Sequence, residues 1–126
     1  MAPLDPTDDE KAELARLMDI ARDASEFLKV FAHEGRFLIL CHLAGGERSV
    51  TELERLISQR QAAVSQQLAR LRLEGIVEAR RDGKAIYYRL ADERALRLID
   101  MVLRLYGAEG AEAAATTLDA SVAKRR

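Results

Sequence analysis

The first quarter of the chain has the hydrophobic pattern of one long amphipathic helix. From about Asp9 to Phe31, apolar residues recur at spacings of three, four and seven, which places them on one helical face. The acidic residues around the start lie where negative charge stabilises a helix N-terminus. The apolar positions of this predicted helix are Leu14, Leu17, Met18, Ala21, Leu28 and Phe31.

A second, shorter helix is predicted from Glu34 to Leu43. Gly35 marks the break from the first helix, and Gly45-Gly46 stops the second. About half of this segment is apolar. Its apolar residues are Phe37, Leu38, Leu40, Cys41 and Leu43.

Two further helices are predicted in the centre of the chain. Ser49 and Glu52 have the spacing of a capping box, which predicts a helix from Val50 to about Ile57. A short connector, Ser58 to Arg60, leads to a helix from Gln61 to Leu73, which ends at Glu74-Gly75. The residues of this last helix that we expect to face inward are Ala63, Val64, Leu68 and Leu71.

The hydrophobic period then changes from about 3.6 to 2, which predicts strands instead of helices. Ile76 to Arg80 and Ala85 to Leu90 are rich in β-branched and aromatic residues, and Asp82-Gly83 between them is a strong hairpin signal. A last amphipathic helix is predicted from about Asp92. Its apolar stripe has heptad-like spacing and consists of Leu96, Ile99, Leu103 and Tyr106.

This order of elements predicts a winged helix-turn-helix, mainly α with a β-hairpin wing, made of five helices and two strands. We expect a flexible N-terminus at residues 1–8, a DNA-binding and dimerisation domain at 9–107, and a weakly helical or disordered tail at 108–126. The length of 126 residues agrees with one small domain.

Charge is distributed unevenly along the chain, although the formal net charge is only −1. Residues 1–26 carry eight acidic and three basic side chains, whereas residues 58–84 carry six basic and three acidic ones. Because affinity for phosphate depends on local cations, the overall charge does not exclude nucleic-acid binding.

The basic region combines a polar helix face with a cationic hairpin. The second helix of a helix-turn-helix enters the major groove, and a hairpin wing lies along the DNA backbone. The alternative is a polar surface that only keeps the protein soluble. The candidate DNA-binding residues are Arg60, Gln61, Ser65, Gln66, Gln67, Arg70, Arg80, Arg81 and Lys84.

The apolar stripes of the first and last helices are longer than one helix-turn-helix unit can cover. Pairing them across a two-fold axis would bury them and would place two recognition helices about one DNA turn apart. The alternative is packing within one chain. We expect a homodimer.

Five segments together resemble the ArsR/SmtB family of winged-helix repressors. The resemblance covers about residues 25–106 and implies a homodimer that leaves its operator when a metal or an oxidant is sensed. The segments are Phe31-Ala-His-Glu-Gly-Arg-Phe-Leu-Ile-Leu40, Ser49-Val-Thr-Glu-Leu53, Ala63-Val-Ser-Gln-Gln-Leu68, Leu71-Arg-Leu-Glu-Gly75 and Arg80-Arg-Asp-Gly-Lys84-Ala-Ile-Tyr-Tyr88.

The metal sites of that family are not matched. Its Cys-x-Cys before the third helix corresponds here to Arg48-Ser49-Val50-Thr51, and the last helix has Asp100 but no histidine. We therefore expect no metal and no other cofactor.

Leu38-Ile-Leu-Cys-His-Leu43 resembles instead the thiol-based branch of the family, whose members respond to persulfides or other oxidants. That branch pairs a cysteine of the second helix with one late in the last helix. Cys41 corresponds to the first, but near the second position, at Tyr106-Gly107, this chain has glycine. The resemblance implies a redox-sensing Cys41 that reacts with a small-molecule thiol or persulfide inducer; the alternative is a buried structural cysteine.

The sequence thus predicts a dimeric repressor that binds an inverted-repeat operator in double-stranded DNA and is released by thiol modification at Cys41. Alternatives are a repressor with a non-thiol inducer or none, and a protein-interaction module without DNA binding. An enzyme is not expected, because Cys41 and His42 diverge by about 100° on a helix. With no apolar run of about 18 residues and no secretory signal, we expect a cytoplasmic protein that does not contact a membrane.

Overall fold

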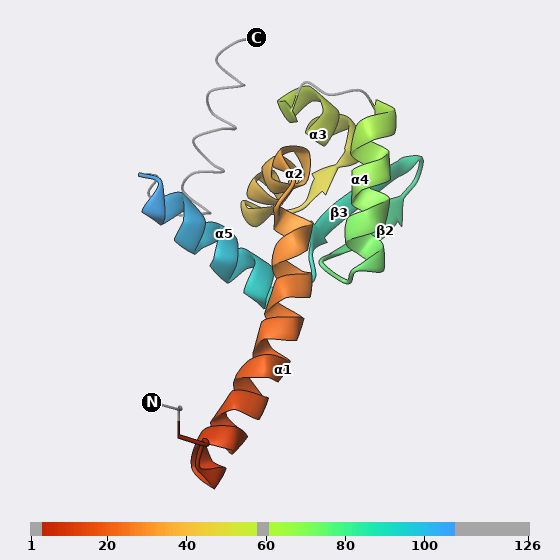
Figure 1. Cartoon of the computed structure of the whole chain (residues 1–126). Coiled ribbons are helices and arrows are strands. Elements are labelled where there is room, and N and C mark those ends of the chain that lie inside the picture. Colours follow the sequence, from red (N-terminus) through yellow and green to blue (C-terminus); the bar gives the residue numbers. More distant parts are fainter. Residues whose placement is uncertain (1–3, 58–60, 108–126) are drawn as a thin grey trace. The chain divides into compact units, whose positions relative to one another are not determined.

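The computed structural model describes residues 4–57 and 61–107 (Figure 1). One compact unit ends at His33 and contains one helix, whereas the other begins at Glu34 and contains all the remaining elements of the described residues. In chain order the elements are α1 (Asp8–Phe31), α2 (Glu34–Ala44), β1 (Arg48–Ser49), α3 (Val50–Ile57), α4 (Gln61–Leu73), β2 (Val77–Asp82), β3 (Ala85–Leu90) and α5 (Glu93–Leu105).

Helix α1 begins with a capping box that the sequence analysis did not identify. The Thr7 hydroxyl accepts a hydrogen bond from the Glu10 amide (3.1 Å), and the Glu10 carboxylate accepts one from the Thr7 amide (2.9 Å). These bonds satisfy two backbone donors that have no partner within the helix, so α1 starts one residue before the predicted position. Near its C-terminal end, the rings of Phe27 and Phe31 pack at 5.0 Å between centroids.

Helix α2 forms the centre of the second unit. Every residue from Ile39 to Ala44 is buried, and the helix contacts α3, α4, α5 and β3. A helix without a wide polar face is stable only when other elements cover it on several sides. The side chains that complete this core are Leu53, Val64, Leu68, Leu71, Ile76, Val77, Tyr88, Ala95 and Ile99.

The two predicted hairpin strands are confirmed, but their number was too low, because the described residues form a three-stranded antiparallel sheet in the order β1-β3-β2. Strand β1 has two residues, with Arg48 opposite Tyr88 and Ser49 opposite Tyr87. So short a strand has no detectable hydrophobic period, and only pairing with β3 makes it extended. The sheet therefore connects the hairpin directly to the start of α3.

The hairpin has a tighter turn than predicted. Its ladder runs from Val77 opposite Leu90 to Asp82 opposite Ala85, so β2 ends two residues later than expected. The loop is reduced to Gly83 and Lys84, and Gly83 has a φ of +63°, a left-handed conformation that favours glycine.

The predicted limits of α3 and α4 are confirmed, and α5 begins one residue after its predicted start. In the capping box of α3, the Ser49 hydroxyl accepts from the Glu52 amide (3.1 Å), and the Glu52 carboxylate accepts from the Ser49 amide (3.2 Å). Helices α3 and α4 contact each other as the two helices of a helix-turn-helix. The cap at Ser49 therefore determines where this motif begins.

We expect Ser49→Ala to lower the free energy of unfolding by about 1 kcal/mol, because the Glu52 amide loses its acceptor at a buried position. Urea unfolding followed by circular dichroism measures this change. Thr7→Ala is the control, since it removes the same kind of bond from an exposed helix end where water replaces it. A loss for Thr7→Ala as large as that for Ser49→Ala would contradict this assignment.

Candidate nucleic-acid interface

Helix α4 has one buried and one exposed face, as predicted. Val64, Leu68 and Leu71 are fully buried, and Ala63 is half-buried. The exposed side chains between them are short or polar, as a helix that reads base edges requires. They are Ser65, Gln66, Ala69 and Arg70.

Three of the predicted DNA-binding residues on or before α4 are not among these exposed side chains. Gln67 is half-buried, and its side-chain carbonyl oxygen is buried without a hydrogen-bond partner in the described part of the chain. Gln66, its neighbour, is exposed because one residue turns the helix by about 100°. Gln61 begins α4, and Arg60 lies outside the described residues.

Strand alternation separates the two adjacent arginines of the wing. Successive side chains of β2 point to opposite faces of the sheet. Val77 and Ala79 lie on one face together with Arg81, and β2 contacts α4. Arg80 lies on the opposite face, where its partner in the register is Tyr87. The pair Arg80-Arg81, which looks like one cationic patch in the sequence, therefore serves two different surfaces.

Arg80 is engaged with other residues of the protein. Its guanidinium donates to the Glu47 carboxylate at 2.6, 2.9 and 3.0 Å and lies 4.7 Å from the centroid of the Tyr87 ring. The hydrogen bonds from Arg80 hold the pKa of Glu47 below its usual value and raise that of Arg80. Arg80 thus differs from the freely available cation that the sequence suggested.

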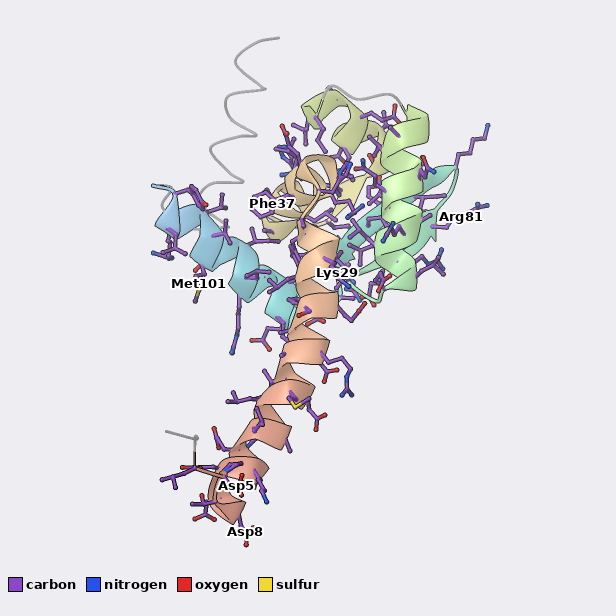
Figure 2. The ribbon with its side chains drawn as sticks, in the orientation of Figure 1. Asp5, Asp8, Lys29, Phe37, Arg81 and Met101 are labelled. Carbon is purple, nitrogen blue, oxygen red and sulfur yellow. The ribbon has the colours of Figure 1, made fainter. Side chains whose placement is uncertain are left out.

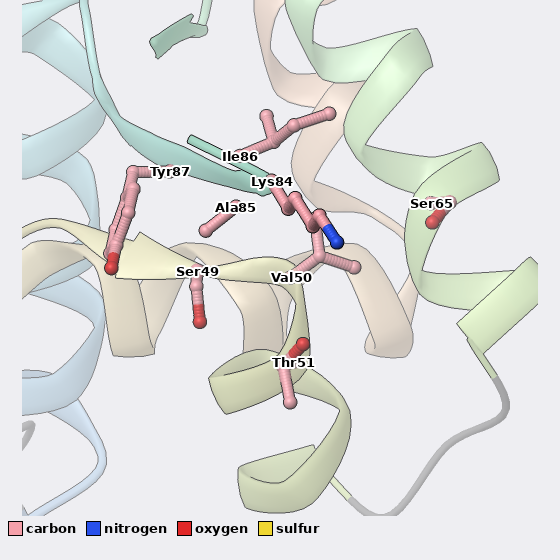
Figure 3. A pocket seen from close by; sticks show the side chains of 8 residues that line it. All are labelled: Ser49, Val50, Thr51, Ser65, Lys84, Ala85, Ile86 and Tyr87. Atoms are coloured by element: carbon pink, nitrogen blue, oxygen red, sulfur yellow. The ribbon is translucent and has the colours of Figure 1, made fainter. Parts of the chain in front are cut away.

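Arg81 and Lys84 are exposed at the end of the hairpin; Figure 2 shows Arg81 extending from the ribbon. Lys84 lines a cleft of about 400 Å³ together with Ser65 of α4 and Thr51 of α3 (Figure 3). The other lining residues are Ser49, Val50, Ala85, Ile86 and Tyr87. The fold therefore brings the wing, the recognition helix and the start of α3 to the same cleft, with an ammonium group and several hydroxyls on its walls.

Cys41 and His42 are buried within α2, away from the surface that a dissolved reagent contacts first. Burial raises the pKa of the Cys41 thiol to about 11. Burial, followed by the nearby Arg48 guanidinium, lowers the pKa of His42. Both groups are therefore mostly uncharged at neutral pH.

No three His, Cys, Asp or Glu side chains gather as a metal site in residues 4–57 and 61–107. Within the same ranges, no helix is both long enough and apolar enough to cross a membrane.

Two helices leave apolar side chains exposed. On α1, Leu14, Leu17, Met18, Ile20 and Leu28 are each about half-exposed. Along α5 and its C-cap, the predicted stripe is split: Ile99 is buried, Leu96 and Leu103 are half-buried, and Tyr106 is 87% exposed. Two further apolar side chains of α5, Met101 and Leu105, are also largely exposed; Figure 2 labels Met101.

The chain is similar to known regulators. Residues 33–79 match the family described as "Bacterial regulatory protein, arsR family". The biofilm growth-associated repressor of Agrobacterium fabrum is 42% identical over 101 residues, which are 80% of this chain and 86% of that protein. The chain belongs to the arsR family. It is a winged-helix, DNA-binding transcriptional regulator and not an enzyme.

Two solved structures show the same fold as this arsR-family chain. The transcriptional repressor BigR from Xylella fastidiosa has a TM-score of 0.71 at 38% identity, covering 75% of this chain and 97% of that one. Reduced HlyU from Vibrio cholerae has a TM-score of 0.70 at 35% identity, covering 73% and 97%. HlyU is named a transcriptional activator.

Glu47 and Thr51 of this arsR-family regulator belong to the interface region, although neither was predicted there. Thr51 follows the cap residue Ser49 by two positions, so its place at the start of α3 was a usable signal. Glu47 gave none, because its partner Arg80 is 33 residues away in the sequence.

Proposed function

We propose that this protein is a homodimeric repressor that acts in the cytoplasm and binds an inverted-repeat operator in double-stranded DNA. One observation carries the proposal: Ser65 of α4 and Lys84 of the wing line the same cleft. A recognition helix and a cationic wing that meet in this way contact base edges and the flanking backbone together. Repression is inferred from the names of the Agrobacterium and Xylella proteins.

In this proposal each exposed residue has a defined contact. Gln66 and Arg70 on α4 reach base edges in the major groove, where the Gln amide pairs with adenine and the Arg guanidinium with guanine. Lys84 and Arg81 neutralise backbone phosphates. Ser65 donates its hydroxyl to a phosphate at the cleft. Arg60 and Gln61 remain candidates by sequence position alone.

Replacing Arg81 or Lys84 with Ala should weaken operator binding and flatten its dependence on salt. Each lost phosphate contact lowers the slope of log K against log salt by about 0.9, hence by about 1.8 for a dimer. Fluorescence anisotropy with operator DNA at several salt concentrations measures both quantities. Arg16→Ala is the control, because this arginine pairs with Glu13 (2.7 Å) on α1 and lies away from the apolar face of that helix.

Gln66→Ala should leave the slope of log K against log salt unchanged. It should reduce discrimination between the operator and mutated sites by about 1–3 kcal/mol, as expected for a base contact. The proposal would be refuted if the salt slopes of Arg81→Ala and Lys84→Ala stayed at the parent value. Equal affinity of the parent for the operator and for unrelated DNA fragments would also refute it. A transcription assay on the bound promoter decides between repression and activation.

The exposed apolar residues of α1 and α5 support the homodimer. A contiguous apolar surface on a soluble protein marks an interaction site, and an inverted-repeat operator requires a partner of the same sequence. Leu14, Leu17 and Met18 lie along one face of α1, and Met101 and Leu105 lie on α5. A second copy that buries these side chains completes the DNA-binding protein.

Leu17→Glu should convert the dimer to monomers and reduce operator affinity at least about tenfold, because a carboxylate is costly to bury at an apolar interface. Sedimentation equilibrium gives the mass. Ala12→Glu adds the same charge on the opposite face of α1 and should remain dimeric. Equal dissociation by both variants, or by neither, contradicts an interface along this stripe.

We further propose that thiol modification at Cys41 releases the operator. Cys41 lies in α2, which contacts α3, α4, α5 and β3, so an added sulfur or oxygen atom forces neighbouring elements apart. The related HlyU structure from Vibrio cholerae is described as reduced, which specifies a redox state for that protein. Burial of Cys41 favours the second candidate, a repressor in which this thiol only fills the core.

On treatment with a persulfide donor, the Cys41 thiolate should attack the donor's outer sulfur and break its S–S bond, so that the donor leaves as its thiol and Cys41 keeps one added sulfur. This reaction should be slow, and the adduct should lower operator affinity at least about tenfold. The reaction is slow because a pKa of about 11 leaves about one thiolate in 3,000 at pH 7.5. Mass spectrometry follows the adduct, and anisotropy follows release. If Cys41→Ala responds as the parent does, or if the adduct leaves affinity unchanged, the structural candidate holds.

A further inference from the structure

We propose that Glu47 and Arg80 form a strut that holds the wing in position against the helix-turn-helix, so that Arg80 positions the wing and does not bind DNA phosphate. The inference rests on the proposed contact between the wing and DNA. It assigns Arg80 a positioning role within the protein, whereas the sequence position of this residue suggested a contact with DNA.

The contacts of the pair are those of a fixed connection. The Arg80 Nε donates to both carboxylate oxygens of Glu47 (3.0 and 2.9 Å), and its Nη2 donates to Oε1 (2.6 Å). Such multiple bonds fix the orientation of the guanidinium plane as well as the distance. Glu47 lies two residues before the cap of α3, so the bonds connect the start of the helix-turn-helix to the middle of β2.

The ring of Tyr87 supports the same connection. Tyr87 on β3 lies opposite Ser49 of β1 on one side and opposite Arg80 of β2 on the other. The Arg80 guanidinium lies 4.7 Å from the centre of this ring. The guanidinium is thus held by hydrogen bonds to a carboxylate and by its position over an aromatic ring. All three strands are joined at one level of the sheet.

The surroundings of Arg80 disfavour a phosphate. Strand alternation places Glu78, Arg80 and Asp82 of β2 and Arg89 of β3 on this face of the sheet, and Glu47 joins them through its bonds to Arg80. The face therefore carries three carboxylates and two guanidinium groups. Arg89 is paired with Glu78. The Arg80 Nη1 lies 3.7 Å from Oδ2 of Asp82, and Arg80 also contacts Glu47. A phosphate on this face would meet more negative than positive charge.

Arg81 has the opposite surroundings. It points to the face that packs toward α4, and among the described residues no ion pair or hydrogen bond of its side chain is found. Both arginines are exposed, but only the charge of Arg81 is available to DNA. The strut therefore places Arg81 and Lys84, which lie one and four residues after Arg80.

Reversing the charges of the pair tests the strut. Glu47→Arg adds two positive charges to the protein and should nevertheless weaken operator binding about tenfold, because like charges push the wing away from its place. Arg80→Glu should weaken binding at least as much. The double variant has the parent's net charge and a restored ion pair, and should recover to within about threefold of the parent with an unchanged salt slope.

A phosphate-binding Arg80 predicts the reverse pattern. Glu47→Arg would then bind DNA more tightly than the parent, and the double variant would bind no better than Arg80→Glu. Either result overturns the strut. Arg81→Ala provides the slope expected when a true phosphate contact is lost.

A measurement without DNA separates this inference from the proposed function. Amide hydrogen exchange in β2 and β3 should be faster in either single variant and parent-like in the double variant, with α2 unchanged as evidence of folding. If a reversed-charge variant does not fold, Glu47→Gln provides the same comparison. Parent-like hairpin exchange in every variant overturns the strut. Failure of the parent to bind any operator overturns only the proposed function.

Discussion

Removing α2 from water brings α3, α4, α5 and β3 together, since each of them contacts this helix. Its side chains from Ile39 to Ala44 point in several directions and are all buried, so one neighbouring element cannot cover them. The recognition helix and the wing are therefore held against a common support. Their relative geometry follows from the core that they share.

The two faces of the sheet that closes this core give its charged residues different surroundings. Alternation along β2 directs Arg81 toward the side of α4 and Arg80 toward Glu47, although the two arginines are adjacent in the chain. One cation remains available to a polyanion while its neighbour is neutralised within the protein. Under the proposed function, a count of basic residues in the wing thus overstates the number of phosphates that it can bind.

Burial of Cys41 has two opposing consequences for its use as a sensor. Contact with many elements means that any added atom disturbs the packing on which the DNA-binding surface depends. Exclusion of water also raises the pKa of the thiol and so protects it from the reagents that would modify it. A sensor built on such a residue responds only when α2 opens, whereas a structural cysteine needs no such opening.

Local sequence signals determined the elements: the capping box at Ser49 and the apolar period placed Val50–Ile57 and Gln61–Leu73 correctly, because helix starts and faces depend on residues within one or two turns. The same rules separated buried from exposed positions on α4, with Gln67 as the exception. Tertiary structure alone decided that residues 48 and 49 form a strand and that Arg80 pairs with a carboxylate 33 residues away. Both depend on which distant segments the core brings together, and no local period or spacing records that choice.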